Sequence, residues 1–176
     1  PPGSTYKMVM AIAGIHDGYI SSNSIIKTQG KYMKYAATDF APTCLAWTMN
    51  GGTHGPIDVT VALQKSCNYF FYDVGDNISL SRIDFTAKSL GLGEATGIEL
   101  GEKLGMRANA ENKAKLNANS LDGKDRWYAA DQVMAAIGQS INQFTPMQLC
   151  SYTSTLANRG VRYKATFLNR VVSSDY

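Results

Sequence analysis

The sequence has few of the features that mark membrane-spanning, metal-binding or nucleic-acid-binding chains. Its longest apolar run, residues 8–15, has eight residues and includes a glycine, whereas a membrane-spanning helix needs about 18 or more. The three cysteines, Cys44, Cys67 and Cys150, form neither a C-x-x-C pair nor a Cys/His cluster, so no zinc site is expected. A net charge of +3, from 17 basic and 14 acidic residues, is scattered along the chain and predicts no nucleic-acid partner.

The 176 residues, 44% hydrophobic and 18% charged, have the composition of one globular domain. A fold of this length buries roughly 70% of the surface that its unfolded chain exposes, so its core needs neither disulfides nor a metal. The chain starts at Pro1, and no basic-then-apolar leader precedes it. We therefore expect residues 1–176 to be a piece of a longer protein, truncated at both ends, with any signal or anchor upstream.

Caps, prolines and glycine stops predict six helices. The clearest signal is Thr145, an N-cap followed by Pro146 at the first helical position and by Gln148, which completes a capping box. The predicted segments are 4–13, 56–65, 68–74 closed by Gly75, 79–90, 128–137 and 145–160. The apolar side of the first helix is expected to consist of Met8, Val9 and Ile12.

The segments outside the predicted helices carry three further expectations. Residues 14–55 should be mostly loops and short strands, with Phe40 and Trp47 packed into the core. Residues 101–124 are poor in large apolar side chains and should form an exposed loop. Residues 166–173, rich in β-branched and aromatic side chains, predict a strand.

Ser4 and Lys7 form an S-x-x-K motif at the start of the first predicted helix. This spacing places a serine hydroxyl and a lysine amine one turn apart on one face. A nearby amine activates the serine by accepting its proton, and the positive end of the helix favours developing negative charge. The spacing alone is weak evidence, because about one match is expected by chance in this composition and the sequence has a second, Ser24 to Lys27.

A second short motif, S-x-N, occurs three times, beginning at Ser21, Ser66 and Ser140. Only Ser66 to Asn68 lies between two apolar helical segments, where a kinked loop can direct both side chains into a cleft. Helix capping by Ser66 and Asn68 is an equally good reading of the tripeptide alone.

Several ordered blocks of the sequence together resemble the penicillin-binding protein transpeptidases, particularly the monofunctional class B, elongation-type proteins similar to penicillin-binding protein 2. Residues 1–7, Pro-Pro-Gly-Ser-Thr-Tyr-Lys, are similar to the active-site opening of that family. The further blocks are His54 to Val59 with Ser66 to Tyr72, Leu90 to Gly93 with Thr96 to Ile98, Ile137 to Gln139, and Thr145 to Leu149 with Ala157 to Gly160. The matches cover nearly all of the chain.

The resemblance assigns roles to four residues. It makes Ser4 the nucleophile and Lys7 its proton acceptor, and it gives the backbone N–H of Ser4 to the oxyanion hole. The counterpart of Ser66 relays the proton to the leaving amine, and the counterpart of Asn68 hydrogen-bonds the substrate peptide. The family's third motif, Lys-Thr/Ser-Gly, is absent, because residues 27–30 contain an extra residue and lie too early in the chain. The 176 residues by themselves are therefore expected to be inactive.

The resemblance also implies a fold and a reaction. The fold would be α+β, of the β-lactamase and transpeptidase type, with mostly the helical lobe present here and an incomplete antiparallel sheet. In a D,D-transpeptidase, Ser4 would attack the carbonyl between the two terminal D-alanines of a peptidoglycan stem peptide, and a neighbouring stem amine would take the acyl group. β-Lactams would acylate the same serine.

The resemblance further implies the setting in which the chain works. No cofactor or metal is required. The expected partners are stem peptides, β-lactams and other cell-wall synthesis proteins, without nucleic acid. The expected location is the extracytoplasmic face of the bacterial cell membrane, with the anchor in a segment outside this chain.

Two alternatives remain open. A class A serine β-lactamase would also need a glutamate on a loop, and residues 125–128, Asp-Arg-Trp-Tyr, have Tyr128 where that glutamate should be. A non-catalytic β-lactam sensor would keep the same fold and is distinguished by its flanking sequence. A Ser-His-Asp triad using His16 or His54 is not favoured, because no G-x-S-x-G motif is present.

Overall fold

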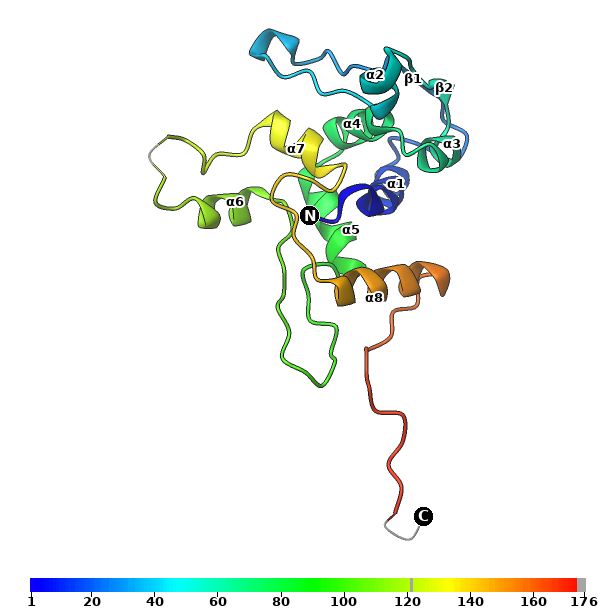
Figure 1. The fold of residues 1–176 in the computed structure, drawn as a ribbon, viewed down its shortest axis with the longest axis vertical. Helices are drawn as coiled ribbons and strands as arrows, with labels where there is room; N and C mark the ends of the chain where they lie inside the picture. The colour runs from blue at the N-terminus through cyan, green and yellow to red at the C-terminus, as the bar shows by residue number, and fades with distance from the viewer. Residues whose placement is uncertain (121, 174–176) are drawn as a thin grey trace.

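The computed structural model describes residues 1–120 and 122–173 as a helical assembly with a short two-stranded sheet (Figure 1). Its elements in chain order are the 3-10 turn η1 (Gly3–Tyr6), α1 (Lys7–His16), β1 (Ile26–Thr28), the 3-10 turn η2 (Ala36–Thr38), α2 (Leu45–Asn50), β2 (Gly55–Ile57), α3 (Val59–Gln64), α4 (Asn68–Asn77), α5 (Leu80–Ser89), α6 (Ala110–Leu116), α7 (Ala129–Ala135) and α8 (Pro146–Ala157). Over these two ranges, no helix has the length and apolar character needed to cross a membrane.

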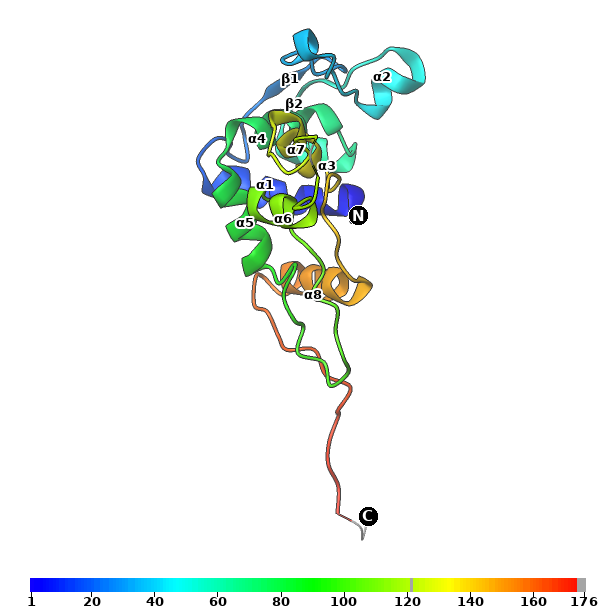
Figure 2. The same ribbon diagram turned by 90° about the vertical axis from the view of Figure 1, so that its left-hand side faces the viewer.

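The core lies where α1 packs against α4 and α5, with α7 on the other side of α4 (Figures 1 and 2). Val9 and Met10 of α1 are fully buried, as are Phe70 and Phe71 of α4. Burying a side chain of this size contributes roughly 1.5–3 kcal/mol. Four such side chains therefore fix the position of α1, which begins at Lys7 directly after the turn η1 that carries Ser4. Ile12, expected on this packed side, is instead 37% exposed.

Gly75 is a packing residue inside α4 and does not end the helix. A Cβ at this position would overlap the Cβ of Ala136, which follows α7. The missing side chain thus lets α4 and α7 approach closely, and α4 continues to Asn77. The prediction that this helix ends at Gly75 was wrong, because the glycine serves a contact that is distant in sequence.

The small sheet joins two segments that lie far apart in the sequence. β1 and β2 pair in antiparallel register, with Ile26 opposite Ile57 and Thr28 opposite Gly55. The second helix was predicted from residue 56, but residues 55–57 form β2 and α3 begins at Val59. Its N-cap is Asp58, whose carboxylate Oδ1 accepts a hydrogen bond from the Val61 N–H at 2.8 Å.

The predicted loop at 101–124 contains the helix α6, so that expectation was wrong. Asn109 caps α6 by accepting a hydrogen bond from the Asn112 N–H at 2.8 Å. Lys113 of α6 pairs with Asp131 of α7 at 2.5 Å. A helix with so little apolar surface is held by its cap and by ion pairs, which is why its hydrophobic pattern did not reveal it.

Residues 166–173, all of which the structure describes, do not form the predicted strand. This segment is extended but has no neighbouring strand, and it leaves the helices as a tail (Figure 2). Thr166 and Phe167 contact Glu99, and the Phe167 N–H donates to the Glu99 carboxylate at 2.9 Å. β-Branched and aromatic residues form a strand only where a sheet edge accepts them. Of the two aromatic residues expected in the core, Phe40 is partly buried and packs against the core, whereas Trp47 is 39% exposed.

Candidate active site

The turn η1 presents Ser4 at the surface and directs Lys7 into the interior. Ser4 is exposed, whereas Lys7, the first residue of α1, is only 2% exposed. Gly3 holds the turn in a left-handed conformation, with φ of 58°. Its N–H donates to the carbonyl of Gly138 at 3.0 Å, which anchors the turn to the segment after α7.

Two residues that the sequence reasoning did not select as functional also support this turn. A Cβ on Gly138 would overlap the carbonyl oxygen of Gly3, so only glycine allows this approach. The hydroxyl of Tyr152, buried in α8, donates to the carbonyl of Thr5 at 2.9 Å. The signal for Gly138 was its place in the Ile-Gly-Gln block, whereas nothing in the sequence links Tyr152 to a residue 147 positions away.

Ser66 and Asn68 lie at the junction of α3 and α4. The N–H of Ser66 donates to the Leu63 carbonyl at 3.1 Å, and the N–H of Cys67 donates to the Ala62 carbonyl at 2.9 Å. These bonds close a tight turn in which Ser66 has a φ of 48°, the left-handed region that non-glycine residues rarely adopt. The turn leaves Ser66 exposed and Cys67 buried.

The structure brings all four predicted side chains together. The Lys7 ammonium donates to the Ser66 hydroxyl at 2.9 Å, to the Ser66 carbonyl at 2.8 Å and to the Asn68 amide oxygen at 2.5 Å. The Ser66 hydroxyl in turn donates to the Ser4 hydroxyl at 3.0 Å. Ser66 therefore bridges the exposed serine and the buried amine. Asn68 uses its amide oxygen on Lys7, which leaves its NH₂ group able to donate to a ligand.

The alternative matches of the two short motifs lie outside this cluster. Ser24 bonds to Ser21 in a loop, with hydroxyl oxygens 3.0 Å apart, and Lys27 is exposed on β1. Thr28, within the imperfect Lys-Thr-Gln-Gly segment, is buried in the same strand and donates to the Gly55 carbonyl at 3.0 Å. Burial of the lysine distinguishes the Ser4–Lys7 match from the Ser24–Lys27 match.

Burial lowers the pKa of Lys7 and so favours its neutral form. Desolvation lowers the pKa of this amine to about 8, opposed by the nearby thiols of Cys44 and Cys67, which favour its charged form. The Lys7 Nζ atom also lies 5.9 Å from the ring centre of Phe71. A buried amine with such a pKa is partly neutral near pH 7, and the neutral form can accept a proton.

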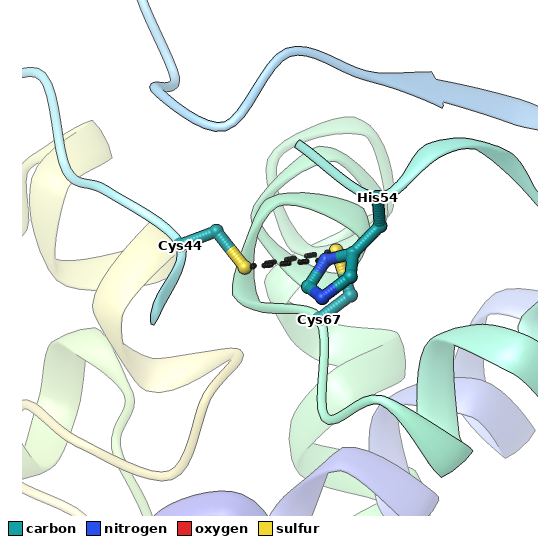
Figure 3. Close-up of side chains that lie close together, drawn as sticks. All are labelled: Cys44, His54 and Cys67. Carbon is teal, nitrogen blue, oxygen red and sulfur yellow. Dashed lines mark hydrogen bonds between the residues drawn. The ribbon is translucent and has the colours of Figure 1, made fainter. Parts of the chain in front are cut away.

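Cys44, His54 and Cys67 form a second cluster (Figure 3), and Cys67 is the middle residue of the Ser66–Asn68 turn. The Cys44 sulfur lies 3.6 Å from Nδ1 of His54 and 3.9 Å from the Cys67 sulfur. The sulfur–sulfur hydrogen bond lowers the pKa of Cys44 and raises that of Cys67. The expectation that the cysteines form no Cys/His cluster was wrong, because folding joins residues that share no short motif. These three side chains have the donor atoms to hold a metal ion.

An exposed serine linked through a second hydroxyl to a buried amine, at the start of a helix, is an arrangement that can activate a serine for acyl transfer. The sequence model of the family described as "Penicillin binding protein transpeptidase domain" matches residues 1–175. The chain belongs to this family, as the sequence blocks predicted.

Curated relatives and solved structures agree with this assignment. The peptidoglycan D,D-transpeptidase MrdA of Salmonella typhimurium strain LT2 is 31% identical over 172 residues, covering 91% of this chain and 24% of that protein. The MrdA of Acinetobacter baumannii is 28% identical over 162 residues, covering 91% of this chain and 22% of that protein. The chain thus spans about a quarter of the length of these relatives.

Two solved structures share the fold. The penicillin-binding protein PBP2 of Helicobacter pylori, in complex with MreC, has a TM-score of 0.83 and 26% identity, over 96% of this chain and 29% of that chain. PBP2 of Pseudomonas aeruginosa, in complex with WCK 5153, has a TM-score of 0.82 and 27% identity, over 94% of this chain and 36% of that chain. These likenesses confirm the predicted fold class, with mostly helices and a small antiparallel sheet in this chain.

Proposed function

We propose that this chain supplies the nucleophile and the proton-transfer residues of a peptidoglycan D,D-transpeptidase. The observation that carries the proposal is the hydrogen-bonded series from Ser4 through Ser66 to Lys7. Serine needs a base to become nucleophilic, and a neutral Lys7 at the end of this series supplies one. The D,D-transpeptidase MrdA relatives support the same reaction.

In the proposed acylation step, Ser4 Oγ forms a bond to the carbonyl carbon between two terminal D-alanines. The Ser4 proton passes to Ser66 Oγ as the Ser66 proton passes to Lys7 Nζ. When the tetrahedral intermediate collapses, the proton returns from Lys7 through Ser66 to the leaving D-alanine amine, and an acyl-enzyme remains on Ser4. The backbone N–H of Ser4 is the proposed oxyanion donor contributed by this chain.

Asn68 has a separate role in this proposal. Its amide oxygen is bonded to Lys7, so its NH₂ group donates to a carbonyl of the stem peptide. The acyl group then passes to the amine of a second stem peptide and forms the cross-link. A β-lactam presents a reactive amide to the same serine and acylates it in the same way.

The setting of the enzyme is part of the proposal. We place it on the extracytoplasmic face of the bacterial membrane, anchored through a segment outside this chain, with other cell-wall synthesis proteins as partners. The H. pylori PBP2 complex with MreC supports such partners. We also propose that residues 1–176 are part of a larger transpeptidase domain, because the sequence lacks a Lys-Thr/Ser-Gly motif.

The test is acylation by a fluorescent penicillin, followed by mass spectrometry of the labelled peptide. In the purified full protein, the adduct is expected on Ser4, and Ser4→Ala should abolish it. Ser24→Ala is the matched control, since Ser24 belongs to the other S-x-x-K match, and it should label like the wild type. An adduct that persists in Ser4→Ala, or that maps to Ser24, would contradict the assignment.

A second assay separates transpeptidation from the β-lactamase and sensor alternatives. With a stem pentapeptide ending in D-Ala-D-Ala and an acceptor stem amine, the full protein should release D-alanine and form a dimeric peptide. A β-lactamase would instead turn over penicillin rapidly, and a sensor would acylate once without any peptide product. Either result would overturn the transpeptidase proposal while leaving Ser4 as the nucleophile.

A further inference from the structure

The buried side of α8 carries polar groups that bond to the backbone of other segments. Gln148 and Tyr152 lie one turn apart on this side and are 1% and 0% exposed. The Gln148 NH₂ group donates to the carbonyls of Glu94 and Leu104, at 2.8 Å each. The Tyr152 hydroxyl donates to the Thr5 carbonyl at 2.9 Å. A buried polar group costs free energy unless it is hydrogen-bonded, so these bonds determine how α8 lies against the turn η1.

The Tyr152 hydroxyl lies at the junction between η1, which ends at Tyr6, and α1, which begins at Lys7. In a continuous α-helix, the Val9 N–H would donate to the Thr5 carbonyl, four residues earlier. Here that carbonyl accepts from Tyr152. Burial raises the pKa of Tyr152, and a hydrogen bond from the Val9 N–H to the same oxygen opposes this rise. The hydroxyl therefore donates to one member of this helical pair and accepts from the other.

We propose that Tyr152 is a positioning residue for the nucleophile, with its hydroxyl inserted between η1 and α1 in place of the direct bond from Val9 to Thr5. A side chain that inserts into the hydrogen-bond ladder of a helix changes the local helix geometry. The inserted hydroxyl keeps residues 3–6 in the 3-10 conformation, and this conformation sets where Ser4 lies. The inference rests on the proposed function, because Ser4 is the nucleophile only in that proposal.

The geometry of the two helix types gives the size of the effect on Ser4. A 3-10 helix rises about 2.0 Å and turns about 120° per residue, whereas an α-helix rises about 1.5 Å and turns about 100°. Because Ser4 precedes Lys7 by three residues, a change of η1 to α-helix would move it by about 1.5 Å along the axis and rotate it by about 60°. A shift of this size would break the 3.0 Å hydrogen bond from the Ser66 hydroxyl to Ser4.

The first test is Tyr152→Phe in the purified full protein, which removes only the hydroxyl. The Thr5 carbonyl and the Val9 N–H then lose their partner, and they can regain one by bonding directly to each other. Stopped-flow acylation by a chromogenic cephalosporin separates the dissociation constant of the initial complex from the acylation rate constant. The rate constant should fall at least tenfold, because misplacing a reacting group by about 1 Å can cost about 10²-fold. The dissociation constant should change by less than about twofold.

Tyr32→Phe is the matched control. Tyr32 is also buried, at 4% exposure, and its hydroxyl donates to the Asp76 carboxylate at 2.7 Å. Both variants should melt at a lower temperature than the wild type, because each loses a hydrogen bond from a buried hydroxyl. At a temperature where both are folded, only Tyr152→Phe should acylate slowly. Replacing Tyr152 with 4-aminophenylalanine restores an N–H donor at the same place and should recover the rate to within about threefold of the wild type.

A second test is the crystal structure of the unmodified full protein, which does not depend on whether a variant folds. The Val9 nitrogen should lie within about 3.2 Å of the Tyr152 oxygen, and the Thr5 carbonyl should accept from Tyr152 and not from Val9. In the crystal structure of Tyr152→Phe, the Val9 N–H should donate directly to Thr5, and the Ser4 hydroxyl should no longer be bonded to Ser66.

Three results would overturn this role of Tyr152. They are a direct Val9-to-Thr5 hydrogen bond in the wild type, a loss of acylation rate in Tyr152→Phe smaller than about tenfold, and an equal loss in Tyr32→Phe. The wild-type crystal structure does not depend on acyl transfer, so an inserted hydroxyl in a protein that never acylates at Ser4 would refute only the proposed function. Acylation at Ser4 that is unchanged in Tyr152→Phe would refute only the positioning role.

Discussion

Replacing Ser66 with alanine removes the hydroxyl that joins Ser4 to Lys7. In the wild type, Ser66 Oγ lies 3.0 Å from Ser4 Oγ and 2.9 Å from Lys7 Nζ. Without this oxygen, the proton of Ser4 has no direct route to the amine. Lys7 keeps its bonds to the Ser66 carbonyl and to Asn68, so the amine should stay in place and the variant should fold.

The expected loss in acylation rate follows from the value of a positioned acid–base group. Such groups contribute typically 10²- to 10⁴-fold. A water molecule can occupy the space left by the Ser66 hydroxyl and restore part of the path, so we expect the lower end, about 10²-fold, or about 2.7 kcal/mol in activation free energy. The free energy of unfolding should change by only about 1 kcal/mol, the net value of one exposed hydrogen-bonded hydroxyl.

The assay is stopped-flow acylation of the full protein by a chromogenic cephalosporin, together with thermal unfolding. Ser140→Ala is the matched control, because Ser140 also begins an S-x-N tripeptide and also has a positive φ, 57° against 48° for Ser66. Both variants should therefore carry the same backbone penalty, but only Ser66→Ala should slow acylation. Acylation of Ser66→Ala within threefold of the wild type, or an equal loss in Ser140→Ala, would refute the relay.

Three further predictions test other parts of the site. Because Lys7 must be neutral to accept a proton and its pKa is lowered to about 8, the acylation rate should rise tenfold per pH unit below pH 8 and level off above it, and a flat profile would contradict this role. Lys7→Ala should abolish measurable acylation, whereas Asn68→Ala should only slow it, and single-turnover kinetics that show equal losses would remove the distinction. Gly138→Ala should lower both the melting temperature and the acylation rate, because its Cβ would overlap the Gly3 carbonyl. Gly160→Ala is the control, because Gly160 has a similarly positive φ but open space around it, and it should lower both quantities less than Gly138→Ala does.

The part of the site that the sequence predicts best is local. Ser4 and Lys7 are one turn apart, so a helix start after a Pro-Gly turn was enough to place both on one face. The same spacing at Ser24 and Lys27 has no such context, and the structure puts Lys27 on an exposed strand position. Pattern and local context together separated the two matches, although the pattern alone did not.

The contacts that position these residues depend on distant parts of the chain. Ser66 meets Ser4 across 62 residues, and Tyr152 reaches Thr5 across 147. A motif states which residue types are present but not which hydroxyl lies between two others, so the bridging place of Ser66 came only from the structure. The same reasoning applies to Gly75, whose place inside α4 is set by Ala136 and not by its own helix.

The cluster of Cys44, His54 and Cys67 shows why rules based on sequence spacing fail to predict some groups of neighbouring side chains. Those rules describe ligands that share one hairpin or one helix, where two or three intervening residues fix the geometry. Here 9 residues separate Cys44 from His54 and 12 separate His54 from Cys67, so strand pairing and the length of α3 set the distances. Cys67 nevertheless lies between the two residues of the S-x-N motif, next to a serine in an unfavourable backbone conformation. Cys44 contacts both Cys67 and His54, so these side chains help to hold the turn. Substitutions of Cys44 or His54 should therefore change the acylation rate, although neither residue contacts Ser4.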